Sequence, residues 1–138
     1  MRIRDLMTKS LETIGPDEPL RQAAERMRIH SIGALPVMEG GQLVGMLTDR
    51  DITVRSTAMG KDPNVTRVRD AMTSAVITCG PDDPLSEAER LMEDWMVRRL
   101  IVVDSERHPL GLISLDDLAT VPGERMVEAR EEAQRSPL

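Results

Sequence analysis

Two similar stretches of the chain carry the residues best suited to bind a ligand. One ends in Thr48 and Asp51, the other in Ser114 and Asp117. In each, an apolar strand-like run leads to a hydroxyl residue, and an aspartate follows three positions later in a predicted helix. The free N–H groups and the dipole of a helix N-terminus favour an anion. A carboxylate can also accept from two neighbouring hydroxyls, such as a ribose diol.

The same spacing has a purely structural interpretation. Ser/Thr-x-x-Asp is close to the capping box that begins many helices, and a hydroxyl can cap and bind at once. For a single copy we favour capping, but two copies at equivalent places favour ligand contact by Asp51 and Asp117. Asp49 and Asp116 are interpreted as first-turn helix acids. Arg50 is interpreted as part of a solvated face, or as a cation beside the first stretch.

The chain is an internal duplication with an offset of 65 residues, which becomes 66 after an insertion near Arg107. Arg-Asp-x-Met-Thr occurs at 4–8 and at 69–73, and Gly-Pro-Asp-x-Pro-Leu occurs at 15–20 and at 80–85. Two repeats of this size are expected to share one core by pseudo-twofold packing. The predicted boundaries are 1–58 for repeat 1, 59–66 for a linker, 67–121 for repeat 2 and 122–138 for a charged tail, partly helical from Glu124.

Each repeat is predicted to be α+β, in the order strand, helix, strand, strand, helix. Asp17 is expected to cap the first helix, with Pro19 in its first turn. The helix of each repeat shows one apolar face with a period near 3.6 residues, which predicts core packing. These faces consist of Leu20, Ala23, Ala24 and Met27, and of Leu85, Ala88, Met92 and Trp95.

Composition disfavours several classes of function. The net charge of -6 disfavours general binding to nucleic acid or acidic lipid, and Trp95 is the single aromatic residue, so base stacking on rings is not expected. No apolar run is long enough to span a bilayer. Cys79 is the single cysteine, so it cannot form an intrachain disulfide, and we expect a buried, inert thiol in a reducing cytoplasm.

Neither metal binding nor catalysis is predicted. His30 and His108 each lack a second histidine or cysteine at the spacing of metal ligands. No Gly-x-Ser-x-Gly motif, no phosphate-loop lysine motif and no nucleophile–base arrangement is present. We therefore expect no catalytic residues, no metal ligands and no required cofactor.

Taken together, these repeated motifs resemble those of the CBS domain family, named for cystathionine β-synthase. The resemblance rests on the paired Arg-Asp-x-Met-Thr openings, on the run from Val97 to Asp104, and on the two Gly-x-[Leu/Ile]-[Thr/Ser]-x-x-Asp endings. It covers about residues 1–120. It implies two βαββα repeats packed with pseudo-twofold symmetry, known as a Bateman module, of the small stand-alone bacterial type.

The resemblance also implies a ligand, because the family binds adenine nucleotides in two clefts between paired repeats. It implies that Thr48 and Asp51 line one cleft and that Ser114 and Asp117 line the other. In the γ subunits of AMP-activated kinase, basic residues just before the first hairpin strand reach the phosphates.

The two repeats differ at this position before the hairpin. Arg98 and Arg99 occupy it in the second repeat, whereas Gly33 and Ala34 occupy it in the first. Adjacent strand residues point to opposite faces, so at most one arginine is expected to face the cleft directly. We therefore expect unequal sites, with a phosphate tail bound at the second.

The function expected from these observations is that of a regulatory module, without enzymatic activity. It would sense an adenosine-containing nucleotide, AMP or ATP foremost and NAD-like ligands also, and would signal by conformational change. A cytoplasmic homodimer acting on a protein partner in trans is expected, with no role at membranes or on nucleic acid. The alternatives are a ligand-free dimeric interaction scaffold and an S-adenosylmethionine-binding module.

Overall fold

The computed structural model describes residues 1–9 and 11–122, so the predicted helix from Glu124 lies outside the described residues. The fold is α+β, with helices and two small sheets, as predicted from the sequence. The described chain forms two compact units. Unit 1 contains residues 1–9 together with 77–122, and unit 2 contains residues 11–76.

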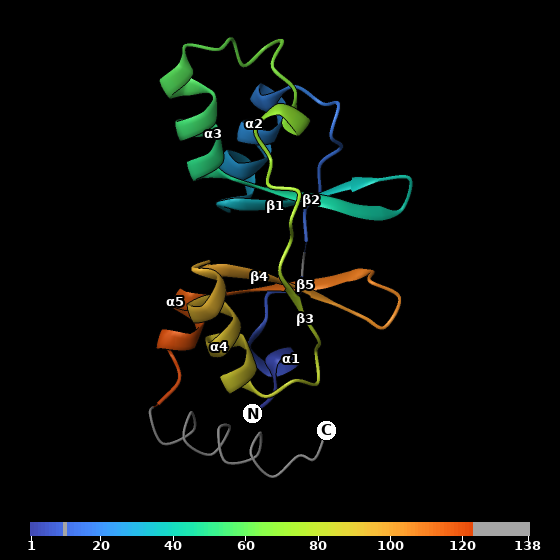
Figure 1. Ribbon diagram of the computed structural model, residues 1–138, viewed down its shortest axis with the longest axis vertical. Helices are drawn as coiled ribbons and strands as arrows, with labels where there is room; N and C mark the ends of the chain where they lie inside the picture. Colours follow the sequence, from blue (N-terminus) through green and yellow to red (C-terminus); the bar gives the residue numbers. More distant parts are fainter. Residues whose placement is uncertain (10, 123–138) are drawn as a thin grey trace. The chain divides into compact units, whose positions relative to one another are not determined.

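Unit 2 is built on an antiparallel hairpin of β1 (Ala34–Glu39) and β2 (Gln42–Thr48). Helices α2 (Leu20–His30) and α3 (Asp49–Arg55) lie over one face of this hairpin (Figure 1). A 3-10 turn, η1 (Thr57–Met59), follows α3. The apolar side of α2 packs on the inward residues of both strands, so the core forms between helix and hairpin. Its largest fully buried side chains are those of Ile14, Leu20, Leu35 and Leu47, followed by Val37 and Val68.

Unit 1 repeats this arrangement. Its sheet has the order β3 (Thr78–Cys79), β4 (Arg99–Val103) and β5 (Pro109–Ser114). Strand β3 runs parallel to β4, and β4 and β5 form an antiparallel hairpin. Helices α4 (Leu85–Trp95) and α5 (Leu115–Ala119) lie on one face of the sheet (Figure 1). In unit 2 the counterpart of β3 is a single parallel bridge between Ile14 and Val37.

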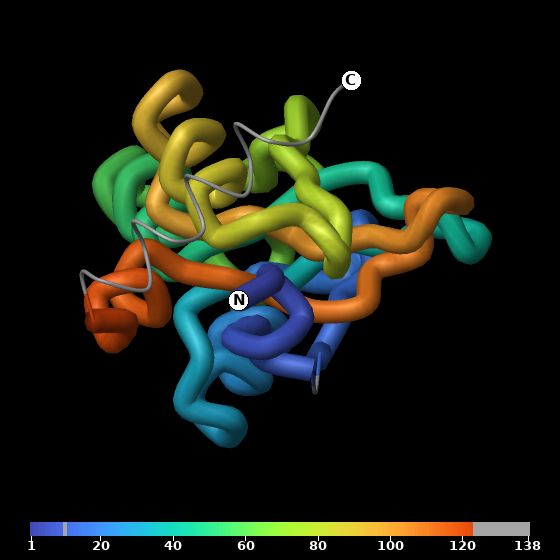
Figure 2. Tube along the Cα trace, turned by 90° about the horizontal axis from the view of Figure 1, so that it is seen from below, coloured from blue at the N-terminus to red at the C-terminus, as the bar shows by residue number. Residues whose placement is uncertain are grey.

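The opening segment of each repeat packs with the elements of the other repeat. We define the opening segments as residues 2–8 and 67–73. The first contains α1 (Ile3–Leu6) and belongs to unit 1, whereas the second contains η2 (Val68–Asp70) and belongs to unit 2. In Figures 1 and 2, α1 lies among the yellow-to-orange elements of unit 1. The compact units therefore cross the repeat boundaries that were drawn from the sequence.

Three details of the predicted helix faces are wrong. Ala24 is exposed, and the side chain of Trp95 is 60% exposed at the last position of α4, so neither contributes to the core. Asp17 does not cap the first helix, because α2 begins at Leu20 with Pro19 as its N-cap. The Asp17 carboxylate instead accepts a hydrogen bond from Arg69, 52 residues away, at 2.8 Å.

No helix among the described residues combines the length and apolar character needed to cross a membrane.

The single glycine of each second hairpin strand, Gly45 in β2 and Gly111 in β5, permits a close approach of the backbone. Gly111 of β5 lies where Thr8 pairs with Leu112, and an added Cβ would stand 2.8 Å from the Thr8 carbonyl oxygen. At Gly45 of β2 the equivalent distance, to the carbonyl oxygen of Thr73, is 3.0 Å. Glycine therefore permits the opening segment to approach the hairpin.

We predict that Gly111→Ala lowers the free energy of unfolding by about 1–3 kcal/mol, because the new methyl group overlaps a backbone oxygen that has little room to move. Denaturant titration measures the change. Gly80→Ala is the matched control, since its added Cβ meets a side chain, the Asp83 carboxylate at 3.3 Å, rather than backbone. A Gly111→Ala protein no less stable than the Gly80→Ala protein contradicts the prediction.

Candidate functional site

The Ser114 site is formed where β5 passes directly into α5. Ser114 is both the last residue of β5 and the N-cap of α5. Its backbone N–H donates to Asp117 Oδ2 at 2.9 Å, and the Asp117 N–H donates to Ser114 Oγ at 3.1 Å. Both side chains are half-buried. The arrangement is a complete capping box, which fixes the hydroxyl and the carboxylate next to the N-terminal N–H groups of α5.

The Thr48 site has the same geometry at the start of α3. The Thr48 N–H donates to Asp51 Oδ2 at 2.9 Å, and the Asp51 N–H donates to Thr48 Oγ1 at 3.1 Å. The structural interpretation of both motifs is therefore confirmed, and ligand contact stays a prediction. The two roles are compatible, because an ionised carboxylate has about four acceptor positions and the box uses one. A hydroxyl oxygen that accepts still has its own proton to donate.

In unit 1 two arginines adjoin this box. The Leu115 N–H donates to the Arg98 carbonyl oxygen at 2.8 Å, and Arg99 is paired with Ser114 across the hairpin. Arg98 Nη2 lies 3.7 Å from Asp116 Oδ1, and the two side chains are 71% and 90% exposed. An exposed pair at this distance contributes little to stability, on the order of 0–1 kcal/mol, so Arg98 can exchange it for a bound anion.

In unit 2 the same backbone positions carry no charge. The Asp49 N–H donates to the Gly33 carbonyl oxygen at 2.9 Å, and Ala34 is paired with Thr48. Ala34 is buried, and Arg50 is an exposed residue of the first turn of α3. The sequence-predicted residues thus come together as two groups. One has Arg98 and Arg99 at the entry to β4, and the other has Gly33 and Ala34 at the entry to β1.

Sequence reasoning did not place the opening segments beside these sites. Thr8 and Leu112 donate to each other's carbonyl oxygens at 2.8 and 3.0 Å, two residues before Ser114. Thr73 and Met46 do the same at 2.9 Å in both directions, two residues before Thr48. The repeated Met-Thr pair was a signal of equivalence, but an offset between two copies does not reveal which copy each one packs against.

The Cys79 thiol is not part of either capping box. Cys79 is buried in β3, with 6% of its surface exposed. Burial, and secondarily the carboxylates of Asp83 and Glu87, raise the pKa of this thiol to about 12. Among residues 1–9 and 11–122, no three His, Cys, Asp or Glu side chains are grouped in a way that could hold a metal ion.

Comparison with known proteins places this fold and these motifs in a family. The CBS domain model matches residues 3–56 and 68–124. The CBS domain-containing protein YhcV of Bacillus subtilis is 40% identical over 117 residues, covering 85% of this chain and 82% of that protein. The chain belongs to the CBS domain family. Hypoxic response protein 1 of Mycobacterium tuberculosis is 36% identical over 117 residues, covering 84% of this chain and 81% of that protein.

Two solved CBS structures are informative about ligands of similar proteins. The crystal structure of hypoxic response protein I contains two coordinated zinc ions. It matches with a TM-score of 0.77 and 33% identity over 88% of this chain and 100% of that chain. The CBS domain pair of protein MJ0100 was solved in complex with 5'-methylthioadenosine and S-adenosyl-L-methionine. It matches with a TM-score of 0.77 and 26% identity over 87% of this chain and 94% of that chain.

We predict that the Cys79 thiol of the folded protein reacts with Ellman's reagent at pH 8 at least about 100-fold more slowly than in denaturant. A pKa near 12 leaves far less thiolate than the ordinary value near 8.5, and burial hinders access. The absorbance of the released thiolate measures the rate. The same protein in guanidinium chloride is the control. Comparable rates in the two conditions contradict the assignment.

Proposed function

We propose that the chain is a regulatory CBS module that binds an adenosine-containing ligand at the Thr48 and Ser114 sites. The observation that carries the proposal is the duplicated box, in which a strand delivers a hydroxyl and a carboxylate to a helix N-terminus in both units. Membership of the CBS family and the adenosine-containing ligands of the MJ0100 pair support it. AMP or ATP is the proposed ligand, with NAD-like nucleotides in the same chemical class.

The carboxylates of Asp51 and Asp117 are the proposed ribose ligands. In each box the backbone fixes one carboxylate oxygen, which orients the carboxylate before a ligand arrives. Two adjacent ribose hydroxyls donate into the remaining acceptor positions. Hydrogen bonds to an ionised group are worth roughly 1.5–3 kcal/mol, so this contact makes a large contribution to affinity.

Phosphate groups are proposed to bind preferentially at the Ser114 site. Arg98 and Arg99 adjoin its box, and a guanidinium group matches phosphate oxygens with two parallel N–H donors. At the Thr48 site the same positions are Gly33 and Ala34, which leave Arg50 as the neighbouring cation. The two sites therefore differ in their preference for charged ligands.

The proposed output is a change in the population of conformations rather than a chemical reaction. A ligand shifts an equilibrium only through its differential affinity for two states, and a partner then reads the favoured state. We propose a cytoplasmic homodimer that acts on a protein partner in trans. We propose no catalytic activity, no required cofactor and no role at membranes or on nucleic acid.

Binding of S-adenosylmethionine is a second candidate, favoured by the ligands present in the MJ0100 pair. This ligand shares the ribose of AMP and carries a carboxylate and a sulfonium cation in place of phosphate. A ligand-free dimeric scaffold is a third candidate, favoured by the fact that both capping boxes are complete without a ligand. Calorimetry with AMP, ATP, NAD and S-adenosylmethionine separates these possibilities, and no binding of any of them at millimolar concentration supports the scaffold.

We predict that Asp117→Asn weakens adenosine binding at the Ser114 site by about 10-fold or more while changing stability by less than ~1 kcal/mol. The amide oxygen of asparagine can still accept from the Ser114 N–H, so the cap persists, but the charged acceptor for ribose hydroxyls is lost. Calorimetry measures affinity, and denaturant titration measures stability.

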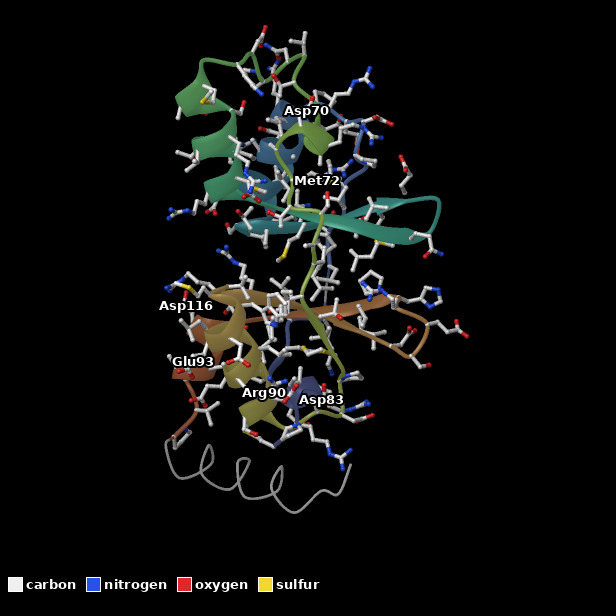
Figure 3. All side chains as sticks on the ribbon, in the orientation of Figure 1. Asp70, Met72, Asp83, Arg90, Glu93 and Asp116 are labelled. Carbon is white, nitrogen blue, oxygen red and sulfur yellow. The ribbon has the colours of Figure 1, made fainter. Side chains whose placement is uncertain are left out.

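The matched control for Asp117→Asn is Asp116→Asn, the same change one position earlier on a side chain that is 90% exposed. Figure 3 labels Asp116 at the beginning of α5. Equal loss of adenosine affinity in both variants points to a general charge effect rather than a ribose contact. Unchanged affinity in Asp117→Asn, in a protein that does bind adenosine, removes this carboxylate from the site.

We predict that Arg98→Ala lowers the affinity for AMP by about 10-fold while leaving the affinity for adenosine within about twofold. Only AMP offers a phosphate, and a charge-assisted hydrogen bond is worth roughly 1.5–3 kcal/mol. Competition binding with the two ligands measures the ratio. Arg90→Ala is the control, because Arg90 lies on α4 of the same unit and pairs with Glu87 and Asp94. Equal losses for AMP and adenosine contradict a phosphate contact.

A further inference from the structure

The turn that precedes α4 in unit 1, and the equivalent turn that precedes α2 in unit 2, is the surface on which an opening segment docks. In unit 1 the Ile3 N–H donates to the Asp83 carbonyl oxygen and the Arg4 N–H to that of Pro81, both at 2.9 Å. Figure 3 labels Asp83 in this turn. Backbone bonds of this kind fix the register of the segment without regard to side chains. They align residues 2–4 along the turn at 81–84.

Unit 2 repeats this docking with residues 65 positions away. The Val68 N–H donates to the Glu18 carbonyl oxygen at 2.9 Å, and the Arg69 N–H donates to that of Pro16 at 2.8 Å. The Gly-Pro-Asp-x-Pro sequence of one repeat thus receives the Arg-x-Arg-Asp sequence of the other in both units. The same set of backbone contacts occurs in both units, so the docking is a feature of the duplicated sequence rather than of one copy.

One aspartate of each turn lies between two arginines of the docked segment. In unit 1, Asp82 Oδ1 accepts from Arg4 Nε at 2.8 Å and lies 3.4 Å from Arg2 Nη1. In unit 2, Asp17 Oδ1 accepts from Arg69 Nε at 2.8 Å and lies 3.4 Å from Arg67 Nη1. These pairs are exposed, so each contributes little to stability, on the order of 0–1 kcal/mol.

The stabilising part of each docked segment is a fully buried apolar side chain. Ile3 is 0% exposed and belongs to the core of unit 1 with Leu85, Leu100 and Ile113. Val68 is 0% exposed and belongs to the core of unit 2. Removing buried methyl groups costs the lost transfer free energy together with the cavity that remains. Each core therefore depends on apolar residues supplied by the other repeat, Ile3 in unit 1 and Val68 with Ala71 in unit 2.

The docked segment of unit 2 has additional contacts. Arg55 Nη1 donates to the carbonyl oxygens of Ala71 and Met72, at 3.1 and 2.9 Å, and Arg69 Nη2 lies 3.2 Å from Glu39 Oε2. Figure 3 labels Asp70 and Met72 along this segment, with Met72 beside β2. With the offset of 66 that applies there, the position equivalent to Arg55 in the second repeat is Val121, which has no guanidinium group.

We propose that the Gly-Pro-Asp-x-Pro turns are docking surfaces for the opening segment of the opposite repeat, and that this exchange makes the stability of each unit depend on the other repeat. Residues 2–8 hold unit 1 together, and residues 67–73 hold unit 2 together, more tightly. The proposal concerns folding alone and holds whether or not either site binds a nucleotide.

Hydrogen exchange, measured by mass spectrometry on the full chain, tests whether each unit depends on the opening segment of the other repeat. Ile3→Ala should speed exchange at the β4 amides of unit 1 by on the order of 30-fold or more, and exchange at the β1 amides of unit 2 by much less. Val68→Ala should give the reverse pattern, with β1 affected more than β4. In the unaltered chain, the amides of Ile3 and Arg4 should exchange faster than those of Val68 and Arg69.

The reciprocal pattern is what distinguishes docking on the opposite repeat from docking within one repeat. Ile3→Ala that speeds β1 more than β4, or two variants that speed both strands equally, overturns the proposal. Faster exchange at Val68 than at Ile3 in the unaltered chain overturns the ranking of the two segments. If Ile3→Ala does not yield folded protein, Ile3→Val replaces it, with an expected effect of about three- to tenfold at β4 and the same criterion.

Discussion

The burial of one branched side chain from each opening segment is the constraint on which the structure depends. Ile3 and Val68 are fully buried, and each completes a core whose other members come largely from the opposite repeat. The neighbouring backbone N–H groups bond to the turns of that same repeat. The chain satisfies these requirements together only by crossing from one unit to the other. A repeat of about 60 residues is marginal as an independent core, so the missing residue matters.

This exchange also positions the candidate ligand sites. Strand β5 is paired with β4 on one edge and with Thr8 on the other, and Gly111 permits that second approach. The strand then reaches Ser114, whose hydroxyl and N–H begin α5. The Ser114 hydroxyl lies where a strand that is paired on both edges meets a capped helix, so its position is closely fixed. The capping box is therefore both a structural feature and a means of holding ligand groups in place before binding.

Much of the fold could be predicted because it depends on local patterns. Hairpin strands and helix faces follow from apolar periodicity, and the duplication shows each element twice. The failures arose where a distant partner or the end of an element decided the outcome. Asp17 has the sequence context of a helix cap, but Arg69 and Arg67 bind its carboxylate and hold its pKa below the ordinary value. The spacing of Trp95 predicts burial, yet α4 ends at that residue and its ring remains exposed.

The exchange itself was present in the sequence as a charge pattern rather than a hydrophobic one. An Arg-x-Arg opening and a Gly-Pro-Asp turn occur in both repeats, and opposite charges that recur together at a fixed offset are candidates for contact. Periodicity cannot say whether such a pair closes within a repeat or between repeats, because both topologies give the same local pattern. For the candidate site, the boxes could be predicted in full, since Ser/Thr-x-x-Asp closes within one turn.

The difference between the two sites arises from positions that the fold leaves unconstrained. The carbonyl groups of Gly33 and Arg98 accept equivalent hydrogen bonds from the first residues of α3 and α5, so backbone geometry does not decide which side chain stands there. Residues 50 and 116, in the first turns of the same helices, are an arginine in one unit and an aspartate in the other. In unit 1 that aspartate pairs with Arg98, so any anion that binds Arg98 there must compete with it. In unit 2 the cation, Arg50, stands on the helix, and the residues at the entry to the first hairpin strand are Gly33 and Ala34. The two sites thus share one backbone geometry but differ in the charges around the same hydroxyl and carboxylate. This difference allows a single chain to distinguish ligands of different charge.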